Sequence, residues 1–188
     1  KASFSGTKIS VANNTVLLIG EQMGIGYMLY KNFLTMDNVE ITVPKGKTLE
    51  FIICDYGTIK DYDNVVLKNI TIKGGGQVSF ISGGSIAVNS IKSVDNSRIL
   101  FIANKNLNMS DPFINADKQL DGGCFLSSAG NMQMLVSGNV TATFYGQMQS
   151  AGLISIGGQS GGTGKLVLRF NKIGEKLKMP NMYYLRAA

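Results

Sequence analysis

Histidine and tryptophan are both absent from this chain of 188 residues. Without histidine, catalytic triads built on that residue and histidine-ligated metals are excluded. Only 3 prolines and 2 cysteines occur, and neither cysteine belongs to a CxxC motif, which argues against a structural zinc site. Glycine is abundant instead, with 23 residues. This profile is typical of many short strands joined by tight turns.

Long apolar runs are also absent. No run reaches the about 20 residues that a membrane-spanning helix needs, so no membrane span is predicted. Cys124 is expected to face inward as a free thiol, because a buried thiol behaves as a small hydrophobe. A disulfide between Cys54 and Cys124 stays open as an alternative.

Positive charge is concentrated near the end of the chain. The formal net charge is +6, yet residues 1–164 carry 12 basic and 11 acidic side chains. The last 24 residues carry six basic side chains against Glu175 alone. No recognisable nucleic-acid-binding module accompanies them, so a nucleic-acid partner is not expected.

Two adjoining stretches of equal length, Asn69–Asn89 and Ser90–Ser110, repeat each other. When they are aligned, apolar residues match at six places. The matched pairs are Ile70 and Ile91, Val78 and Ile99, Phe80 and Phe101, Ile81 and Ile102, Ile86 and Leu107, and Val88 and Met109. A fixed period of about 20 residues indicates a solenoid, because each repeat buries its apolar face against the next.

Each repeat holds three short apolar patches separated by polar corners, which describes one coil of a parallel β-helix. Coils of about 21 residues that stack at about 4.8 Å would give roughly eight turns and a rod on the order of 40 Å long. The same spacing, extended toward the N-terminus, places Ile59 before Phe80 and Val65 before Ile86. An antiparallel sandwich also has many short strands and stays open as an alternative.

The repeat is lost after Ser110. The polar stretch Asp111–Asp121 is therefore predicted to be a loop inserted between coils, and the pattern resumes with Cys124, Tyr145 and Leu166 at 21-residue intervals. We divide the chain into three parts: an N-terminal cap with the first coil (residues 1–38), the β-helix (39–170) and a basic C-terminal cap (171–188).

The coil length, the three patches per coil and the Gly, Asn and Ser corners resemble the right-handed single-stranded parallel β-helix proteins. The segment VEITVPKGKTLEF (Val39–Phe51) is similar to the entry coil of many of them. They include phage tail spikes, autotransporter passenger domains, other bacterial surface adhesins, and polysaccharide lyases and hydrolases. The resemblance implies an all-β right-handed parallel β-helix that is extracellular or lies on a cell or virion surface. Tail-spike-like rods are often homotrimers, so a homotrimer is a candidate assembly.

Aspartates are the candidates for chemistry, in two groups: Asp55, Asp61 and Asp63 in one polar segment, and Asp111, Asp117 and Asp121 in another. The first group would supply the ligands if calcium binds, and no other cofactor is expected. Glycosidases of this fold pair carboxylates on neighbouring coils. Here no acid recurs at a 21-residue offset, so we predict no catalytic residue.

A binding role fits these residues better than catalysis. Tyr56 and Tyr62 lie in the same segment as the first aspartates, and aromatic rings beside acids are typical of sugar-binding surfaces. Together with the second group of aspartates they are the predicted binding residues. The sequence thus favours a non-enzymatic surface adhesin or receptor-binding module that contacts glycan or protein on a host surface. A polysaccharide lyase or glycoside hydrolase of β-helix fold, and a structural spacer of a fibre, stay open as alternatives.

Overall fold

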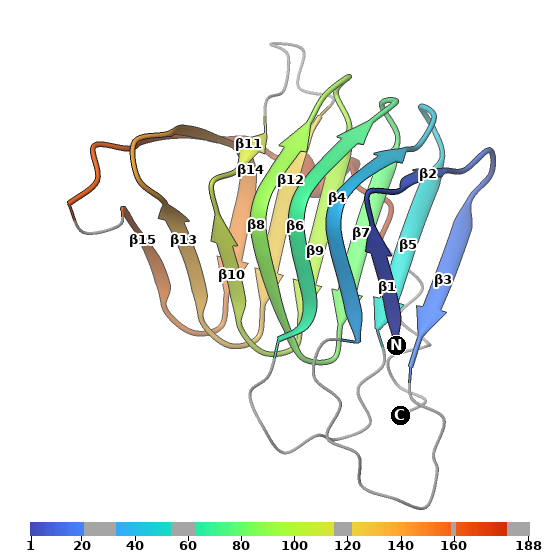
Figure 1. Cartoon of the computed structure of the whole chain (residues 1–188), viewed down its shortest axis with the longest axis horizontal. Coiled ribbons are helices and arrows are strands. Elements are labelled where there is room, and N and C mark those ends of the chain that lie inside the picture. Colours follow the sequence, from blue (N-terminus) through green and yellow to red (C-terminus); the bar gives the residue numbers. More distant parts are fainter. Residues whose placement is uncertain (21–32, 54–62, 115–121, 159–160, 180–188) are drawn as a thin grey trace, which may run out of the picture.

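The computed structural model describes residues 1–20, 33–53, 63–114, 122–158 and 161–179. Within them the chain is all-β and winds as a parallel β-solenoid (Figure 1). Successive coils stack along the long axis of the molecule, and every pairing between described strands is parallel. The predicted parallel β-helix is therefore confirmed as a β-solenoid, and the antiparallel sandwich is wrong. No helix among the described residues is long and apolar enough to cross a membrane.

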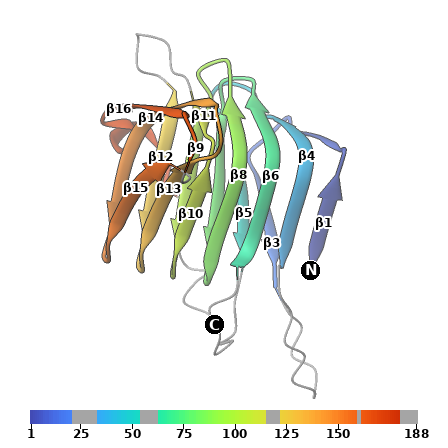
Figure 2. The same cartoon turned by 60° about the vertical axis from the view of Figure 1, so that its left-hand side comes forward.

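Three stacked ladders of strands, here called sides A, B and C, make up the wall of the solenoid (Figures 1 and 2). Three long strands, β4 (Leu34–Thr42), β6 (Asp63–Lys73) and β8 (Ser85–Ser93), run through side A and then bend into side B. Side A also contains β1 (Ala2–Ser5), β10 (Leu107–Ser110), β13 (Met132–Val136) and β15 (Ile154–Gly158).

Sides B and C share the long strand β14 (Thr141–Ser150), whose first half belongs to side B. Side B also contains β2 (Lys8–Ser10), β11 (Phe113–Ile114) and β16 (Lys165–Phe170). Side C contains β3 (Thr15–Ile19), β5 (Thr48–Ile53), β7 (Gln77–Ser82), β9 (Arg98–Ala103) and β12 (Gly123–Ser128).

The length of a coil varies along the chain. Val65 pairs with Ile86 and Ile86 with Leu107, at the spacing that the repeat predicted. Other coils are longer, such as the one that leads from Phe51 to its partner Phe80, and stacked coils are about 25 residues apart. The expectation of roughly eight turns is therefore wrong, because the longer coils give a solenoid of about four turns. Segments inserted between strands lengthen a coil without disturbing the stacked strands.

Aromatic side chains stack inside side C. Phe51, Phe80 and Phe101 are fully buried, and their ring centroids are 5.1 and 5.2 Å apart. The predicted contact of Phe80 with Phe101 is confirmed. Phe51 takes the place expected for Ile59, because nine residues separate β5 from β6 whereas two separate β7 from β8. Ile59 itself lies outside the described residues.

The expected alignment of Cys124, Tyr145 and Leu166 is wrong. Cys124 pairs with Gly146, so the true spacing is one residue longer, and Tyr145 pairs with Arg169. Cys124 is nevertheless a fully buried free thiol, as predicted, while Cys54 lies outside the described residues. Tyr145 itself is partly buried and packs against the hydrophobic core.

In each coil, the chain turns from side A into side B at one residue that adopts a left-handed backbone conformation. These corner residues are Asn38, Asn69, Ser90 and Asp111, with φ between 48° and 59°. Asparagine and aspartate tolerate this region better than most residues, because their short polar side chains bond locally. The chain therefore continues regularly past Asp111, and Phe113 and Ile114 form β11 on side B. The loop predicted for Asp111–Asp121 is wrong at these two residues, and residues 115–121 are not described.

The C-terminal segment, residues 171–179, lies along the outer surface of side C. It contains the 3₁₀ helix η1 (Ile173–Lys176). Ile173 and Leu177 are buried there in a cluster with Leu100 and Phe125, whose side chains point outward from β9 and β12. The C-terminal segment therefore covers part of side C, and the burial of these apolar side chains stabilises it there.

Two polar side chains of the solenoid hold the same segment. The Gln77 side chain, 1% exposed, donates to the Lys178 carbonyl at 2.7 Å and accepts from the Lys178 N–H at 2.9 Å. Arg98 donates through Nη1 to the Lys176 carbonyl at 2.8 Å. With part of side C occupied in this way, sides A and B offer the more open lateral surfaces.

Candidate binding surface

Most of the residues that were predicted to bind a ligand or calcium lie outside the described part of the chain. Asp55, Tyr56, Asp61 and Tyr62 fall in residues 54–62, and Asp117 and Asp121 fall in residues 115–121. Asp63 is the first residue of β6 and its backbone pairs with Ser85. The proposed roles of these residues in calcium or ligand binding stay predictions.

Asp111 is the exception, and its carboxylate is engaged. It is 7% exposed and accepts a hydrogen bond from the Ser137 N–H at 2.7 Å and a second, short one from the Ser137 hydroxyl. Both bonds reach from the corner of one coil to the next. The contacts of Asp111 therefore stabilise the corner between sides A and B, and its role in ligand binding stays a prediction.

Among the described residues no group of three or more cysteine, aspartate or glutamate side chains is placed to hold a metal ion. Several of the described acidic residues instead bond to neighbouring coils, as Asp111 does. The outer surface of side B is then the most informative place to look for a ligand site.

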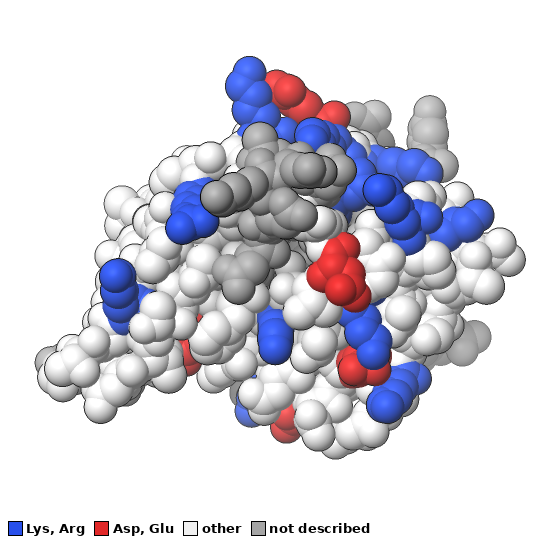
Figure 3. Space-filling view, turned by 90° about the horizontal axis from the view of Figure 1, so that it is seen from above, with Lys and Arg blue, Asp and Glu red and all other residues white. Residues whose placement is uncertain are grey.

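Side B carries, near β14, a group of basic, aromatic and small side chains that are at least partly exposed. We call it the side B patch, and it consists of Lys92, Phe113, Thr143, Tyr145, Lys165, Val167 and Arg169. Each alternates with an inward neighbour such as Ile91, Ile114 or Phe144, all of which are buried. Figure 3 looks onto this side of the molecule and shows basic side chains spread across it, with acidic side chains among them.

Strand pairing brings the members of the side B patch together. Phe113 lies between Lys92 of the preceding strand and Thr143 of the following one. Thr143 is paired in turn with Val167, and Tyr145 with Arg169. Neighbouring strands are about 4.8 Å apart, so these side chains form one continuous surface.

The two aromatic rings of the patch are partly exposed. Phe113 and Tyr145 are neither fully buried nor free in solvent, and each has a cationic neighbour on the adjacent strand, Lys92 and Arg169 respectively. A sugar ring packs well against such an aromatic face, while polar and charged neighbours bond its substituents. The Thr143 hydroxyl is well placed to add a donor and an acceptor.

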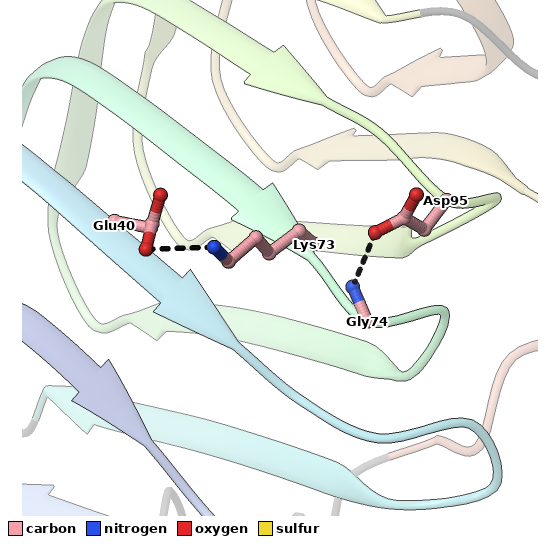
Figure 4. A network of polar contacts seen from close by, with 4 residues as sticks. All are labelled: Glu40, Lys73, Gly74 and Asp95. Atoms are coloured by element: carbon pink, nitrogen blue, oxygen red, sulfur yellow. Dashed lines mark hydrogen bonds and ion pairs between the residues drawn. The ribbon is translucent and has the colours of Figure 1, made fainter.

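Charges on the other half of side B are neutralised within the protein. Lys73 of β6 forms an ion pair with Glu40 of β4, with Nζ and Oε1 2.8 Å apart (Figure 4). This pairing, with its hydrogen bond, lowers the pKa of the Glu40 carboxyl, and Lys8 adds to the effect. Glu40 therefore stays ionised and partners Lys73 over the neutral pH range.

The backbone N–H groups of the glycine corner beside this ion pair also have hydrogen-bond partners within the protein. The Gly74 N–H donates to the Asp95 carboxylate at 3.3 Å, and the Gly75 N–H donates to the Ser97 hydroxyl at 3.1 Å (Figure 4). Gly74 and Gly75 have φ of 95° and 76°, which favours glycine. These amides bond to the next coil, so the corner functions as a turn.

Sequence reasoning missed the side B patch for two specific reasons. Phe113 was placed in a loop, although the 21-residue spacing that pairs it with Lys92 was available as a signal. Tyr145 was assigned to the interior by a frame that is one residue off at Cys124; it packs against the core, but part of its surface is exposed beside Arg169. Aromatics at outward positions can be recognised only when the frame of each coil is known.

Comparisons with protein-family models, with curated proteins and with solved structures found no match to this chain.

Proposed function

We propose that this chain is a non-enzymatic surface-binding module of the adhesin or receptor-binding type, which contacts glycan on a host surface through the side B patch. The observation that carries the proposal is the pair of partly exposed aromatic rings, Phe113 and Tyr145, on adjoining strands of a rigid sheet. A parallel ladder holds outward side chains at a regular spacing, which suits a ligand made of repeating units. An extracellular, cell-surface or virion-surface location belongs to the same proposal.

Binding on a preformed sheet needs little rearrangement. β11 and β14, beneath the two aromatic rings, are paired on both sides, and Ile114, Ala142 and Phe144 anchor them in the core, whereas β16 is paired with β14 alone among the described strands. A ligand therefore meets side chains whose positions are already restricted, which lowers the entropic cost of binding.

The experiment is a broad glycan array, followed by titration calorimetry with the best ligands. The matched variants are Phe113→Thr and Tyr145→Thr on side B and Gln133→Thr on side A, where Gln133 is an exposed strand residue. We expect each of the first two to weaken binding by about tenfold, because one aromatic contact contributes on the order of 1 kcal/mol. Gln133→Thr should leave affinity unchanged.

The result that would overturn the proposal is a blank array with protein shown to be folded by circular dichroism. Protein binding instead of glycan binding would then be tested on the same variants. Equal affinity of the Phe113→Thr, Tyr145→Thr and Gln133→Thr variants for a bound sugar would place the site elsewhere. Sedimentation of the same samples tests the trimer that the tail-spike resemblance implies.

A structural spacer is the second candidate, favoured by the apolar surface at one end of the solenoid. Ile154 and Ile156 of β15 continue the inward rows of Met132 and Met134, yet are 39% and 44% exposed. Apolar residues in such positions, beside the open edge of a terminal strand, are suited to stacking against a further coil. Concentration-dependent end-to-end association, abolished by Ile156→Lys, would support this candidate.

A further inference from the structure

The cations of the side B patch lack acidic partners among the described residues. Lys92, Lys165 and Arg169 are all exposed. The described ion pairs are Lys73 with Glu40 and Lys172 with Glu175, and neither involves the patch. This half of side B therefore differs from the half in which Glu40 neutralises its neighbours.

The described acids near the patch are engaged elsewhere. Asp95, three residues after Lys92, accepts a hydrogen bond from the Gly74 N–H at 3.3 Å. In the row of outward residues that contains Lys92, the next member is Thr71 and the one after it is Glu40, which is already paired with Lys73. On the other side, Thr141 and Thr143 face Lys165 and Val167. Three like charges on one rigid surface repel one another, and an anionic ligand relieves that repulsion.

We infer that the side B patch selects acidic glycans, that is, carbohydrate chains carrying carboxylate or sulfate groups. The inference rests on the proposed function and specifies its ligand class. Arg169 offers the planar fork that bonds a carboxylate or sulfate through two N–H groups, and Lys92 and Lys165 act as point charges. Phe113 and Tyr145 pack against sugar rings between them.

The spacing of the cations fits a chain rather than a single sugar. Lys92 lies on β8 and Lys165 on β16, and the intervening strands are β11 and β14. Three steps of about 4.8 Å separate the two strands by about 14 Å. Acidic groups on successive units of one chain can therefore meet successive cations.

The experiment measures affinity by titration calorimetry for four probes at 50 and 300 mM salt. The probes are a neutral dextran, a polyuronate, a sulfated polysaccharide and a single-stranded DNA of similar length. The proteins are the unaltered chain, the double variant Lys92→Gln with Arg169→Gln, the conservative Arg169→Lys, and Lys68→Gln. Lys68 is an exposed cation on side A and serves as the matched control.

We expect the two acidic polysaccharides to bind more tightly than dextran and to lose affinity at the higher salt, where charges are screened over shorter distances. The double variant, which loses two exposed charge contacts, should bind about tenfold more weakly, because each such contact contributes about threefold. Arg169→Lys keeps the charge but loses the paired N–H contacts, so its affinity should lie between those of the unaltered chain and the double variant. Lys68→Gln should change nothing.

Different outcomes separate this inference from the proposed function. Equal, salt-insensitive binding of dextran and the acidic chains, unaffected by the double variant, overturns the acidic class and leaves glycan binding standing. Failure of every polysaccharide overturns both. Tighter binding of the DNA than of either acidic polysaccharide at the same salt also overturns the inference, because charge alone would then determine the ligand.

Discussion

Phe51 lies directly against Phe80, with ring centroids 5.1 Å apart and ring planes 6° apart, although a whole coil of the chain separates them in sequence. The next ring, Phe101, continues the stack. Three fully buried aromatic side chains in one column align the coils of side C in register. The column therefore links the irregular first coils to the regular 21-residue ones.

Truncating the central ring should be strongly destabilising. Phe80→Ala removes contacts to both neighbours and leaves a cavity, so we expect a loss of about 3–5 kcal/mol in the free energy of unfolding. Urea denaturation followed by circular dichroism measures it. Lys68→Ala, on the exposed face of side A, is the control and should change stability by less than about 0.5 kcal/mol. A loss below about 1 kcal/mol for Phe80→Ala would contradict the stacked column.

Glycine at position 146 is required by close backbone packing. A Cβ atom there would lie 1.8 Å from the carbonyl oxygen of Cys124 on the neighbouring strand. Gly146→Ala should therefore force the backbones of β12 and β14 apart and cost at least about 1–3 kcal/mol. Gly157→Ala is the control, because no atom lies within 4 Å of the added carbon. Similar melting temperatures for the two variants would refute this packing.

Glu50 should make stability fall as the pH rises above 4.5. It is 8% exposed, and burial raises the pKa of its carboxyl above the ordinary 4.5. Between 4.5 and the raised value the folded chain binds more protons than the unfolded chain, so unfolding becomes easier as the pH increases. Glu50→Gln removes this loss. The variant should be more stable than the unaltered chain at pH 7, with no such advantage below pH 4.5.

Glu40 affects the pH dependence of stability in the opposite direction to Glu50. Urea denaturation at a series of pH values measures the free energy of unfolding for both variants. The hydrogen-bonded ion pair with Lys73 lowers the pKa of Glu40, so its contribution to stability is present above pH 4.5 and is lost as the pH falls through the lowered value. Glu40→Gln should therefore reduce stability at pH 7. If Glu50→Gln behaves in the same way at pH 7, the expected effect of burial on Glu50 is wrong.

Cys124 should be unreactive in the folded protein. Its side chain is fully buried, and burial raises the pKa of the thiol well above its ordinary value, so little thiolate forms. In a Cys54→Ser variant, a water-soluble thiol reagent at pH 8 should modify the remaining cysteine only at the rate of unfolding. The same reagent in denaturant provides the positive control. Rapid labelling without denaturant would show that the thiol is accessible.

Gln77 should protect the C-terminal segment from proteolysis. Gln77→Ala removes both hydrogen bonds to Lys178, while the buried contacts of Ile173 and Leu177 remain. We expect trypsin to cleave after Lys176 and Lys178 several times faster, with little change in the melting temperature, because local opening precedes cleavage. Asn89→Ala, an exposed substitution on side A, should not alter the cleavage rate. Equal rates for both variants would show that Gln77 does not hold the segment.

The fold could be predicted from the sequence where the chain is regular. Between Val65 and Ser110 the apolar residues recur every 21 positions, and the pairs Val65 with Ile86 and Ile86 with Leu107 lie where that period placed them. The partner of Phe80 before this stretch could not be predicted in the same way. Counting back one such period leads to Ile59, whereas the residue in contact is Phe51.

The sequence by itself determined the recurring apolar positions that favour a parallel β-solenoid, because stacked coils require apolar residues at regular intervals and those intervals can be counted. Only the tertiary structure decided that Phe113 lies beside Lys92 and that the exposed part of Tyr145 lies beside Arg169, on adjoining strands of side B. Hydrogen bonds between strands set the register of each coil independently of the residues inserted between strands. A shift of one residue exchanges the inner and outer faces of a strand, so the surface could not be predicted without the pairing.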